Sequence, residues 1–196
     1  MTDHLTARFE PRWLLWAREM QAIAQTGLAF ARDQYDRDRY QQLQSLAARV
    51  MAEHSNIPVM DIETMFAMQT GYATPKLGVR AAIFRDQKIL LVREREDGDR
   101  WTLPGGWADV GLSPAENAAK EVREESEYTV KIVRLLAAWD KAKHRHPPSV
   151  FLIWKLVFLG ELMQAGEVVG AETDAVEFFS LNDLPPLSLG QIVPEP

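Results

Sequence analysis

The N-terminal third of the chain has apolar residues spaced as they are on helices. Between positions 13 and 32 they recur every three or four residues, the period of a helix that buries one face. The members of this run are Leu14, Leu15, Ala17, Met20, Ile23, Ala24, Leu28 and Phe30. After a charged stretch, a second run of the same period comprises Tyr40, Leu43, Leu46, Ala47 and Val50. A third, shorter helix is predicted after Asn56, with Pro58 in its first turn and its end before Gly71.

The pattern changes after residue 75, where short β-rich runs replace the helical spacing. Segments 79–84 and 88–93 predict a hairpin with its turn at 85–87. A helix is expected around 114–126, and further strands are expected at 131–140, 150–159 and 176–179. Because helices and strands are segregated, the sequence predicts an α+β fold, with a small all-helical domain at 1–72 and a second domain at 76–196.

Composition narrows the class of protein. The chain has 196 residues, of which 46% are hydrophobic and 26% charged, values typical of a globular protein and not of a collagen-like or disordered one. The absence of cysteine excludes a disulfide framework and a thiolate site, and it fits a cytoplasmic location. We recognise no signal peptide and expect no membrane segment. A net charge of −6 argues against long nucleic acid as a partner.

The candidate chemistry lies in a glycine-rich loop and the helix that follows it. Ser113, Pro114 and Glu116 have the spacing of a capping box, which predicts the start of that helix. Further along, three glutamates stand at positions i, i+3 and i+4, so their carboxylates are expected on one face; they are Glu121, Glu124 and Glu125. Like charges at this spacing repel one another unless water or a cation neutralises them.

Two interpretations of this acidic face are open. Lys120 and Arg123 lie between the glutamates, which is typical of an ordinary solvated face. The preceding Pro104-Gly105-Gly106 favours the second interpretation, because glycines let the backbone approach a ligand closely and its carbonyls can complete a metal shell. Carboxylate oxygens with phosphate and water are the ligands that Mg²⁺ prefers.

Residues 105–128 resemble the Nudix box. The pattern of that family is Gly, five residues, Glu, seven residues, then Arg-Glu-aliphatic-any-Glu-Glu-any-Gly-aliphatic. Here Gly106 matches the first Gly, and Lys120-Glu121-Val122-Arg123-Glu124-Glu125 matches the core. The approach at 101–106 and the stretch 175–185 also resemble the family, so the resemblance spans about 76–187. It implies a Nudix-type α/β/α sandwich with a mixed sheet.

Three positions depart from the family pattern. Leu112 stands where the family has its first Glu, Lys120 where it has Arg, and Glu127 where it has Gly. Lysine lacks the planar fork of arginine, so it is expected to orient a neighbouring glutamate less tightly. Glu127 falls where a left-handed residue is commonly required after a helix, at a cost of about 1 kcal/mol. The three glutamates are intact, so we expect activity, at a reduced level if these positions matter.

The resemblance implies a metal-dependent hydrolase acting on a diphosphate linkage. Glu121 and Glu125, with Glu124 assisting, would hold magnesium or manganese ions, and a main-chain carbonyl of Gly105 or Gly106 would add a ligand. The ions would neutralise the diphosphate and activate the attacking water. The proton acceptor is expected to be one of the helix glutamates or a downstream acid, Glu167 or Glu172.

The helical N-terminal part resembles an extension found in one bacterial Nudix subgroup. That resemblance implies a small-molecule nucleoside diphosphate derivative as substrate, ADP-ribose ahead of CDP-choline, cleaved to a nucleoside monophosphate and a phosphorylated moiety. It also implies a homodimer, although these helices could instead pack only on their own domain. Substrate contacts are expected from a basic loop, from the strand before the box and from the pocket wall: Asp140, Lys141, His144, His146, Arg93, Arg95 and Trp107.

Two other functions remain open. One is hydrolysis at RNA 5′ ends or of other nucleotides, which the acidic charge of the chain disfavours. The other is a Nudix-fold binding or regulatory module that has lost turnover. Leu112 and Glu127 favour this possibility, whereas the intact glutamates count against it.

Overall fold

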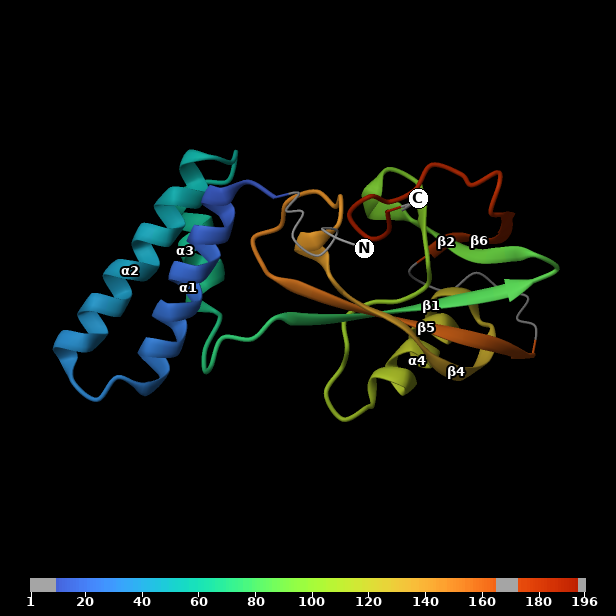
Figure 1. Ribbon diagram of the computed structural model, residues 1–196, viewed down its shortest axis with the longest axis horizontal. Helices are drawn as coiled ribbons and strands as arrows, with labels where there is room; N and C mark the ends of the chain where they lie inside the picture. Colours follow the sequence, from blue (N-terminus) through green and yellow to red (C-terminus); the bar gives the residue numbers. More distant parts are fainter. Residues whose placement is uncertain (1–9, 165–172, 194–196) are drawn as a thin grey trace, which may run out of the picture. The chain divides into compact units, whose positions relative to one another are not determined.

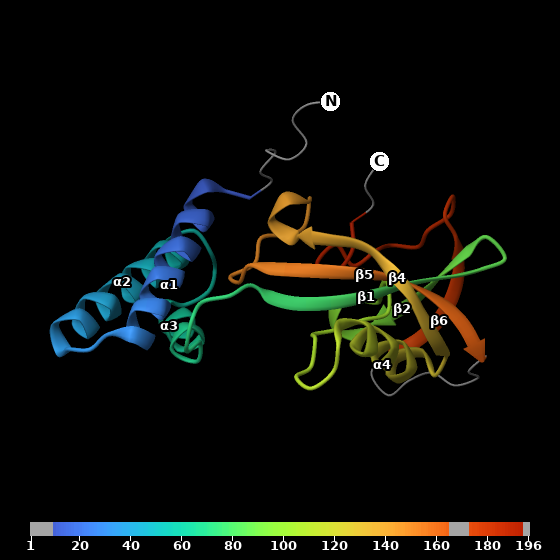
Figure 2. The same ribbon diagram turned by 60° about the horizontal axis from the view of Figure 1, so that its bottom comes forward.

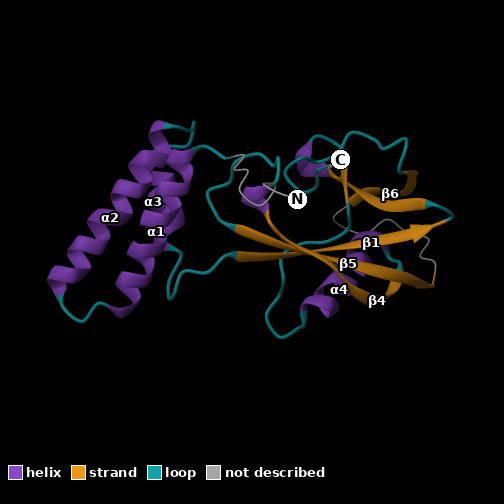
Figure 3. Cartoon of the chain, viewed as in Figure 1, coloured by secondary structure: helices purple, strands orange, loops and turns teal. Residues whose placement is uncertain are grey.

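The structure is a computed structural model, and it describes residues 10–164 and 173–193 (Figure 1). The chain forms two compact units. The first, which we call the helical unit, comprises Met1–Pro75 and Pro148–Leu152; the second, the sheet unit, comprises Lys76–Pro147 and Ile153–Pro196. Figure 3 distinguishes the helices of the first unit (purple) from the strands of the second (orange).

Three helices build the helical unit: α1 (Arg12–Phe30), α2 (Gln34–Glu53) and α3 (Val59–Ala67). The predicted apolar runs form its core, which contains Leu14, Ala17, Ala47, Ala48, Met51, Ile62 and Phe66. The predicted position of Pro58 was wrong by one residue. With ψ at 141° it is still extended and caps α3 from outside the helix, which begins at Val59.

The sheet unit contains strands β1 (Lys76–Arg85), β2 (Lys88–Glu94), β3 (Arg100–Thr102), β4 (Thr129–Asp140), β5 (Ile153–Gln164) and β6 (Thr173–Ser180). It also contains helix α4 (Pro114–Ser126) and two short 3₁₀ helices, η1 (Arg95–Asp97) and η2 (Lys141–Lys143). The sheet runs in the order β3-β2-β1-β5-β4, and β6 also pairs with β2. Because β1 is parallel to β5 while the other pairs are antiparallel, the sheet is mixed, and the predicted fold class is confirmed.

Two strand predictions need correction. The segment Pro148–Leu152 is not part of β5 but belongs to the helical unit, where Val150 packs against the core. Its apolar residues therefore mark a packing contact and not a strand. The short β3 was missed because three residues carry too little periodicity to be recognised. The hairpin was correct, and its turn uses left-handed φ values at Asp86 and Gln87, as a type I′ turn requires.

Helix α4 covers one face of the sheet (Figure 2). Its Val122 is fully buried with Ala81, Ile83 and Leu90, whereas the opposite face of the sheet packs against the C-terminal segment through Leu187 and Ile192. The acidic residues of α4 therefore stand at the edge of a well-packed layer. Among the described residues, no helix combines the length and apolar character needed to cross a membrane.

Candidate active site

The loop before α4 is fixed to strand β1 by main-chain hydrogen bonds. Val79 N donates to Gly106 O, Ala81 N donates to Pro104 O and Ala108 N donates to Leu77 O, each at 2.9 Å. Residues 104–108 thus run along β1 like a short irregular strand. The loop is closed at its other end by the buried Asn117, which accepts from the main-chain N of Asp109 at 2.9 Å.

Helix α4 begins with the capping box that the sequence predicts. Ser113 Oγ accepts from Glu116 N at 3.3 Å, and Glu116 Oε2 accepts from Ser113 N at 2.7 Å. The helix ends at Glu127, whose φ of 54° is left-handed, also as predicted. These two ends fix the rotation of the helix and hence the direction in which its glutamates point.

Glu121 and Glu125 lie together against the glycine loop, and both are more than nine-tenths buried. Glu125 Oε2 accepts a hydrogen bond of 2.8 Å from Gly105 N. The carboxylate of Glu121 lies so close to Gly106 that a Cβ at that position would be 2.6 Å from Oε2. Burial raises the pKa of both carboxyls, that of Glu125 to about 7.

Glu124 departs from the expectation that all three carboxylates share one face. Its side chain is exposed and accepts a hydrogen bond of 2.6 Å from Lys120 Nζ. The same ammonium lies 3.5 Å from Glu121 Oε1 and 3.2 Å from Asp109 Oδ2. Lys120, standing where the family has arginine, therefore gathers three carboxylates at the outer edge of the site. These neighbours raise the pKa of Lys120.

Arg80 is a buried cation directly behind the loop. Its guanidinium donates to Leu103 O at 2.9 Å and to Gln191 Oε1 at 2.6 Å, and it lies 3.8 Å from Glu94 Oε1. Burial lowers its pKa, which the negative charges of Glu125 and Glu94 oppose. Arg80 thus supports the glycine loop and places a fixed positive charge beside the acidic pair.

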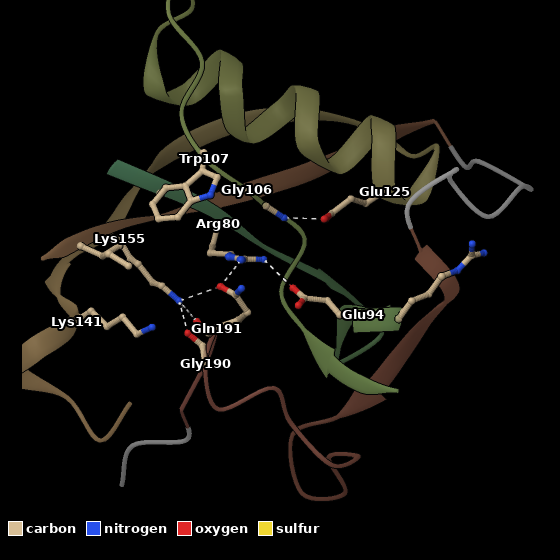
Figure 4. A pocket seen from close by; sticks show the side chains of 13 residues that line it. Arg80, Glu94, Gly106, Trp107, Glu125, Lys141, Lys155, Gly190 and Gln191 are labelled. Atoms are coloured by element: carbon tan, nitrogen blue, oxygen red, sulfur yellow. Dashed lines mark hydrogen bonds and ion pairs between the residues drawn. The ribbon is translucent and has the colours of Figure 1, made fainter. Parts of the chain in front are cut away.

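A cavity of about 740 Å³ opens in front of the loop and Glu125 (Figure 4). Its lining carries four basic side chains and two carboxylates: Arg80, Arg95, Lys141 and Lys155, with Glu94 and Glu125. The remaining lining residues are Gly78, Gly105, Gly106, Trp107, Ile153, Gly190 and Gln191. Cations that face a pair of carboxylates suit a ligand with phosphate groups, whose oxygens accept from basic side chains.

The C-terminal segment forms one wall of this cavity. Lys155 Nζ donates to the main-chain oxygens of Gly190 and Gln191, the first at 3.3 Å, and lies 3.4 Å from Gln191 Oε1. Ser188 Oγ donates to Asp97 Oδ2 at 2.5 Å. Burial lowers the pKa of Lys155 to about 6. The side-chain oxygen of Gln191 therefore joins two buried basic side chains of the site, Arg80 and Lys155.

The structure brings only part of the predicted substrate-binding set to the cavity. Arg95, Lys141 and Trp107 line it. The other four predicted residues are not among those that line it and have partners elsewhere. Arg93 lies 4.0 Å from Asp99, Asp140 caps η2, His144 packs against Trp139, and His146 binds Leu189 O at 2.8 Å. Glu167 and Glu172 lie outside the described residues.

Sequence reasoning missed the cavity residues Arg80, Lys155, Glu94 and Gln191. For two of them a signal was present. Arg80 interrupts the apolar run 79–84, and Lys155 interrupts the run 150–159. A charged residue inside a strand that is otherwise buried needs a partner, and this requirement points to a site.

A divalent cation fits the residues of this site in part. Glu121 and Glu125 supply two desolvated carboxylates, the kind of oxygen ligand that Mg²⁺ and Mn²⁺ take. Gly106 O already accepts from Val79 N, so Gly105 O is the better candidate for a main-chain ligand. Within the described residues, no three acidic or histidine side chains converge closely enough to hold a metal without rearrangement.

The comparisons with known proteins agree with this geometry. A family model described as the NUDIX domain matches residues 74–195, and one described as a UDP-X-like N-terminal oligomerisation domain matches residues 11–66. The Bacillus subtilis (strain 168) candidate ADP-ribose pyrophosphatase YjhB is 44% identical over 92% of this chain and 86% of its own. The Methanocaldococcus jannaschii ADP-ribose pyrophosphatase is 30% identical over 60% of this chain and 69% of its own.

Two solved structures are similar over large parts of the chain. A UDP-X diphosphatase has 35% identity and a TM-score of 0.58, covering 95% of this chain and 90% of the other. An ADP-ribose pyrophosphatase from Streptococcus suis 89-1591 has 44% identity and a TM-score of 0.55, covering 61% and 84%. The chain is thus similar in sequence and structure to proteins named pyrophosphatase and diphosphatase. The chain belongs to the Nudix family and is a Nudix pyrophosphohydrolase.

Proposed function

We propose that the chain hydrolyses the diphosphate linkage of a nucleoside diphosphate derivative, with ADP-ribose ahead of CDP-choline, and that the products are a nucleoside monophosphate and a phosphorylated moiety. The observation that carries this proposal is the pair Glu121 and Glu125, buried against the Gly105–Gly106 loop, with Glu125 and both glycines lining a cavity rich in basic side chains. Relatives named ADP-ribose pyrophosphatase support the choice of substrate.

The residues of the cavity divide the work of binding and orientation. Glu121 and Glu125 would hold Mg²⁺ or Mn²⁺, with Gly105 O as a further ligand and Glu124 at the edge. When bound, the metal neutralises the diphosphate and makes its water a better nucleophile. Arg95 and Lys141 lie where they can donate hydrogen bonds to phosphate oxygens, and Arg80 keeps the loop against β1. The proton acceptor comes from the helix glutamates or from Glu167 or Glu172.

A panel of nucleotides tests this proposal. Phosphate release through a coupled phosphatase is measured with Mg²⁺ and with Mn²⁺ for ADP-ribose, CDP-choline, sugar nucleotides and nucleoside triphosphates. Glu125→Gln removes one carboxylate of the pair, and Glu127→Gln is the matched control because Glu127 is exposed at the end of the same helix. Turnover of a diphosphate conjugate that Glu125→Gln abolishes and Glu127→Gln retains is the expected result.

Two other outcomes would overturn the proposal. Cleavage of 5′-triphosphate RNA in preference to every conjugate would assign the chain to RNA ends. Silence across the panel, together with calorimetric binding of a nucleotide by folded protein, would make it a binding module in which Leu112 and Glu127 are the first residues to restore. A cytoplasmic location stays a prediction of the cysteine-free composition.

A homodimer formed through α1 is part of the same proposal, as are the domain bounds 1–72 and 76–196. Trp16, Ile23 and Phe30 stand seven residues apart on α1, and each is more than half exposed. The buried residues Leu14, Ala17, Gln21 and Ala24 occupy a different face of the helix. A stripe with a period of seven is typical of a seam between helices. The family description of an oligomerisation domain at 11–66 supports a second copy as its occupant.

Light scattering tests the dimer. The chain of 22.3 kDa is expected to elute with twice that mass. Ile23→Asp places a charge in the middle of the stripe and is expected to give a folded monomer. Met60→Asp, at a residue of α3 that is 66% exposed, is the control. An unchanged mass for Ile23→Asp would exclude the α1 stripe as the interface.

A further inference from the structure

Trp107 is an aromatic residue at the cavity that is more than half exposed although its main chain is held in place. It is 57% exposed and lines the cavity together with Arg80 and Glu125 (Figure 4). Its backbone has no freedom to swing, because Gly78 forms a bridge with it and the neighbours on both sides, Gly106 and Ala108, are hydrogen-bonded to β1. The main chain therefore fixes the point from which the indole projects at the cavity.

Most tryptophans of the chain already have a ring or a cation as partner. Trp13 stacks on His54 at 4.8 Å, Trp101 meets Phe179 at 4.7 Å and Trp139 meets His144 at 5.0 Å, while Trp16 lies under Arg12. Trp107 has no such partner within the described residues. A large aromatic surface left in water beside a cavity is typical of a binding site, since covering it is favourable.

The residues beside Trp107 indicate which kind of ligand would contact the indole. The cavity presents basic side chains suited to phosphates, and the acidic pair stands at the glycine loop immediately before the indole. A ligand that places its diphosphate between these groups carries a ribose and a planar base, and Trp107 is the flat apolar surface among the lining residues. A nucleobase has a π face of matching shape.

We propose that the indole of Trp107 is the platform on which the nucleobase of the substrate stacks. The inference rests on the proposed function, because it assumes that the diphosphate lies beside the acidic pair. Stacking recognises the π face that every base has, so the site accepts adenine and uracil alike. Both kinds of nucleoside occur in the names of similar proteins, an ADP-ribose pyrophosphatase and a UDP-X diphosphatase.

Steady-state kinetics with matched substrates test the platform. ADP-glucose, UDP-glucose and CDP-glucose differ only in the base, and the wild type is expected to use them with kcat/KM values within about tenfold of one another. Trp107→Ala is expected to raise KM for all three by about 5- to 150-fold with little change in kcat, and Trp107→Phe to restore most of the loss.

Two controls separate stacking from a structural effect. Trp154 is 50% exposed and lies on β5 between the cavity residues Ile153 and Lys155, so its side chain points to the opposite face of the sheet; Trp154→Ala is expected to change nothing. Inorganic pyrophosphate lacks a base, so its inhibition constant is expected to be the same for Trp107→Ala and the wild type.

Three results would overturn the platform: an unchanged KM in Trp107→Ala, an equal loss of affinity for pyrophosphate, or conversion of Trp107→Ala to a different oligomeric mass, which would make the indole a contact between copies. If the wild type turns over no nucleotide, the proposed function fails separately. Calorimetry of AMP with the wild type and Trp107→Ala then decides the platform. Weaker binding of AMP by the variant supports it, and equal binding refutes it.

Discussion

The substitution Gly106→Ala is expected to move the carboxylate of Glu121 without changing the stability of the fold. The Cβ of Gly106→Ala would lie 2.6 Å from Glu121 Oε2 and 2.9 Å from its Cδ. The backbone of Gly106 has no left-handed φ, so alanine causes no strain there. The atoms that must move are the far end of a flexible side chain. Going from 2.6 Å to an ordinary contact of 3.4 Å, the carboxylate retreats by about 0.8 Å.

We expect Gly106→Ala to lose activity and keep its stability. A displacement of about 1 Å in a catalytic group costs on the order of 100-fold, so kcat/KM should fall by about 10- to 100-fold. The Mg²⁺ concentration needed for half-maximal rate should rise, because a proposed ligand has moved. The free energy of unfolding should change by less than about 1 kcal/mol. Steady-state assays over a range of Mg²⁺ and urea unfolding measure these quantities.

Gly105→Ala is the contrasting variant. Its Cβ would lie 2.1 Å from Val79 O and 2.8 Å from Arg80 Cα, so backbone would have to move, and its φ of 146° adds strain. We expect it to lose about 3 kcal/mol or more of stability. Full activity in Gly106→Ala, or a loss of stability in it equal to that in Gly105→Ala, would refute the assignment of Glu121 to the site.

Three further predictions concern the acidic helix. Burial raises the pKa of Glu125 from 4.5 to about 7, so the metal-free folded protein holds a proton that the unfolded chain releases between those values. Its stability therefore falls as the pH rises through this window, and urea unfolding of Glu125→Gln should show a flatter dependence; an identical slope would contradict this. Lys120→Met leaves Glu121 and Glu124 without their shared cation and should lower kcat about 10-fold or more, whereas Lys120→Arg should keep it; equal losses would argue that Lys120 only packs. Glu127→Gly relieves a left-handed backbone and should add about 1 kcal/mol of stability, seen as a higher melting temperature by calorimetry; a lower one would show that the Glu127 side chain stabilises the helix end.

The elements that could be located from the sequence are those with a repeated apolar pattern or with clear signals at their ends. The helical runs recur every three or four residues, and α4 carries a start signal at Ser113 and a stop at Glu127 that the structure reproduces. The acidic helix and the glycine loop form one continuous stretch, so a single sequence motif locates both. Residues 150–152 were wrongly assigned to the strand, because an apolar run has the same composition whether it joins a strand or packs against helices.

Three residues of the basic loop have partners within the protein in place of the predicted contacts with substrate. His146 binds Leu189 O, a residue 43 positions further along the chain, and is buried there, which lowers its pKa to about 4. His144 packs against Trp139, and Asp140 caps η2. A polar, basic composition predicts exposure to solvent or substrate equally well. Here His146 joins the loop to the C-terminal segment, which forms one wall of the cavity.

Arg80 is an example of a sequence signal that does predict the position of the site. A guanidinium inside a buried strand is costly unless every donor has a partner, so its presence requires acceptors from elsewhere in the chain. The structure supplies Leu103 O from the glycine loop, Gln191 Oε1 from the C-terminal segment and the negative charge of Glu94. The same cation stands beside Glu125, whose pKa burial has raised, and opposes that rise. Arg80 therefore connects the glycine loop, the C-terminal segment and the acidic pair. Each of them supplies an acceptor or a negative charge to the same buried guanidinium.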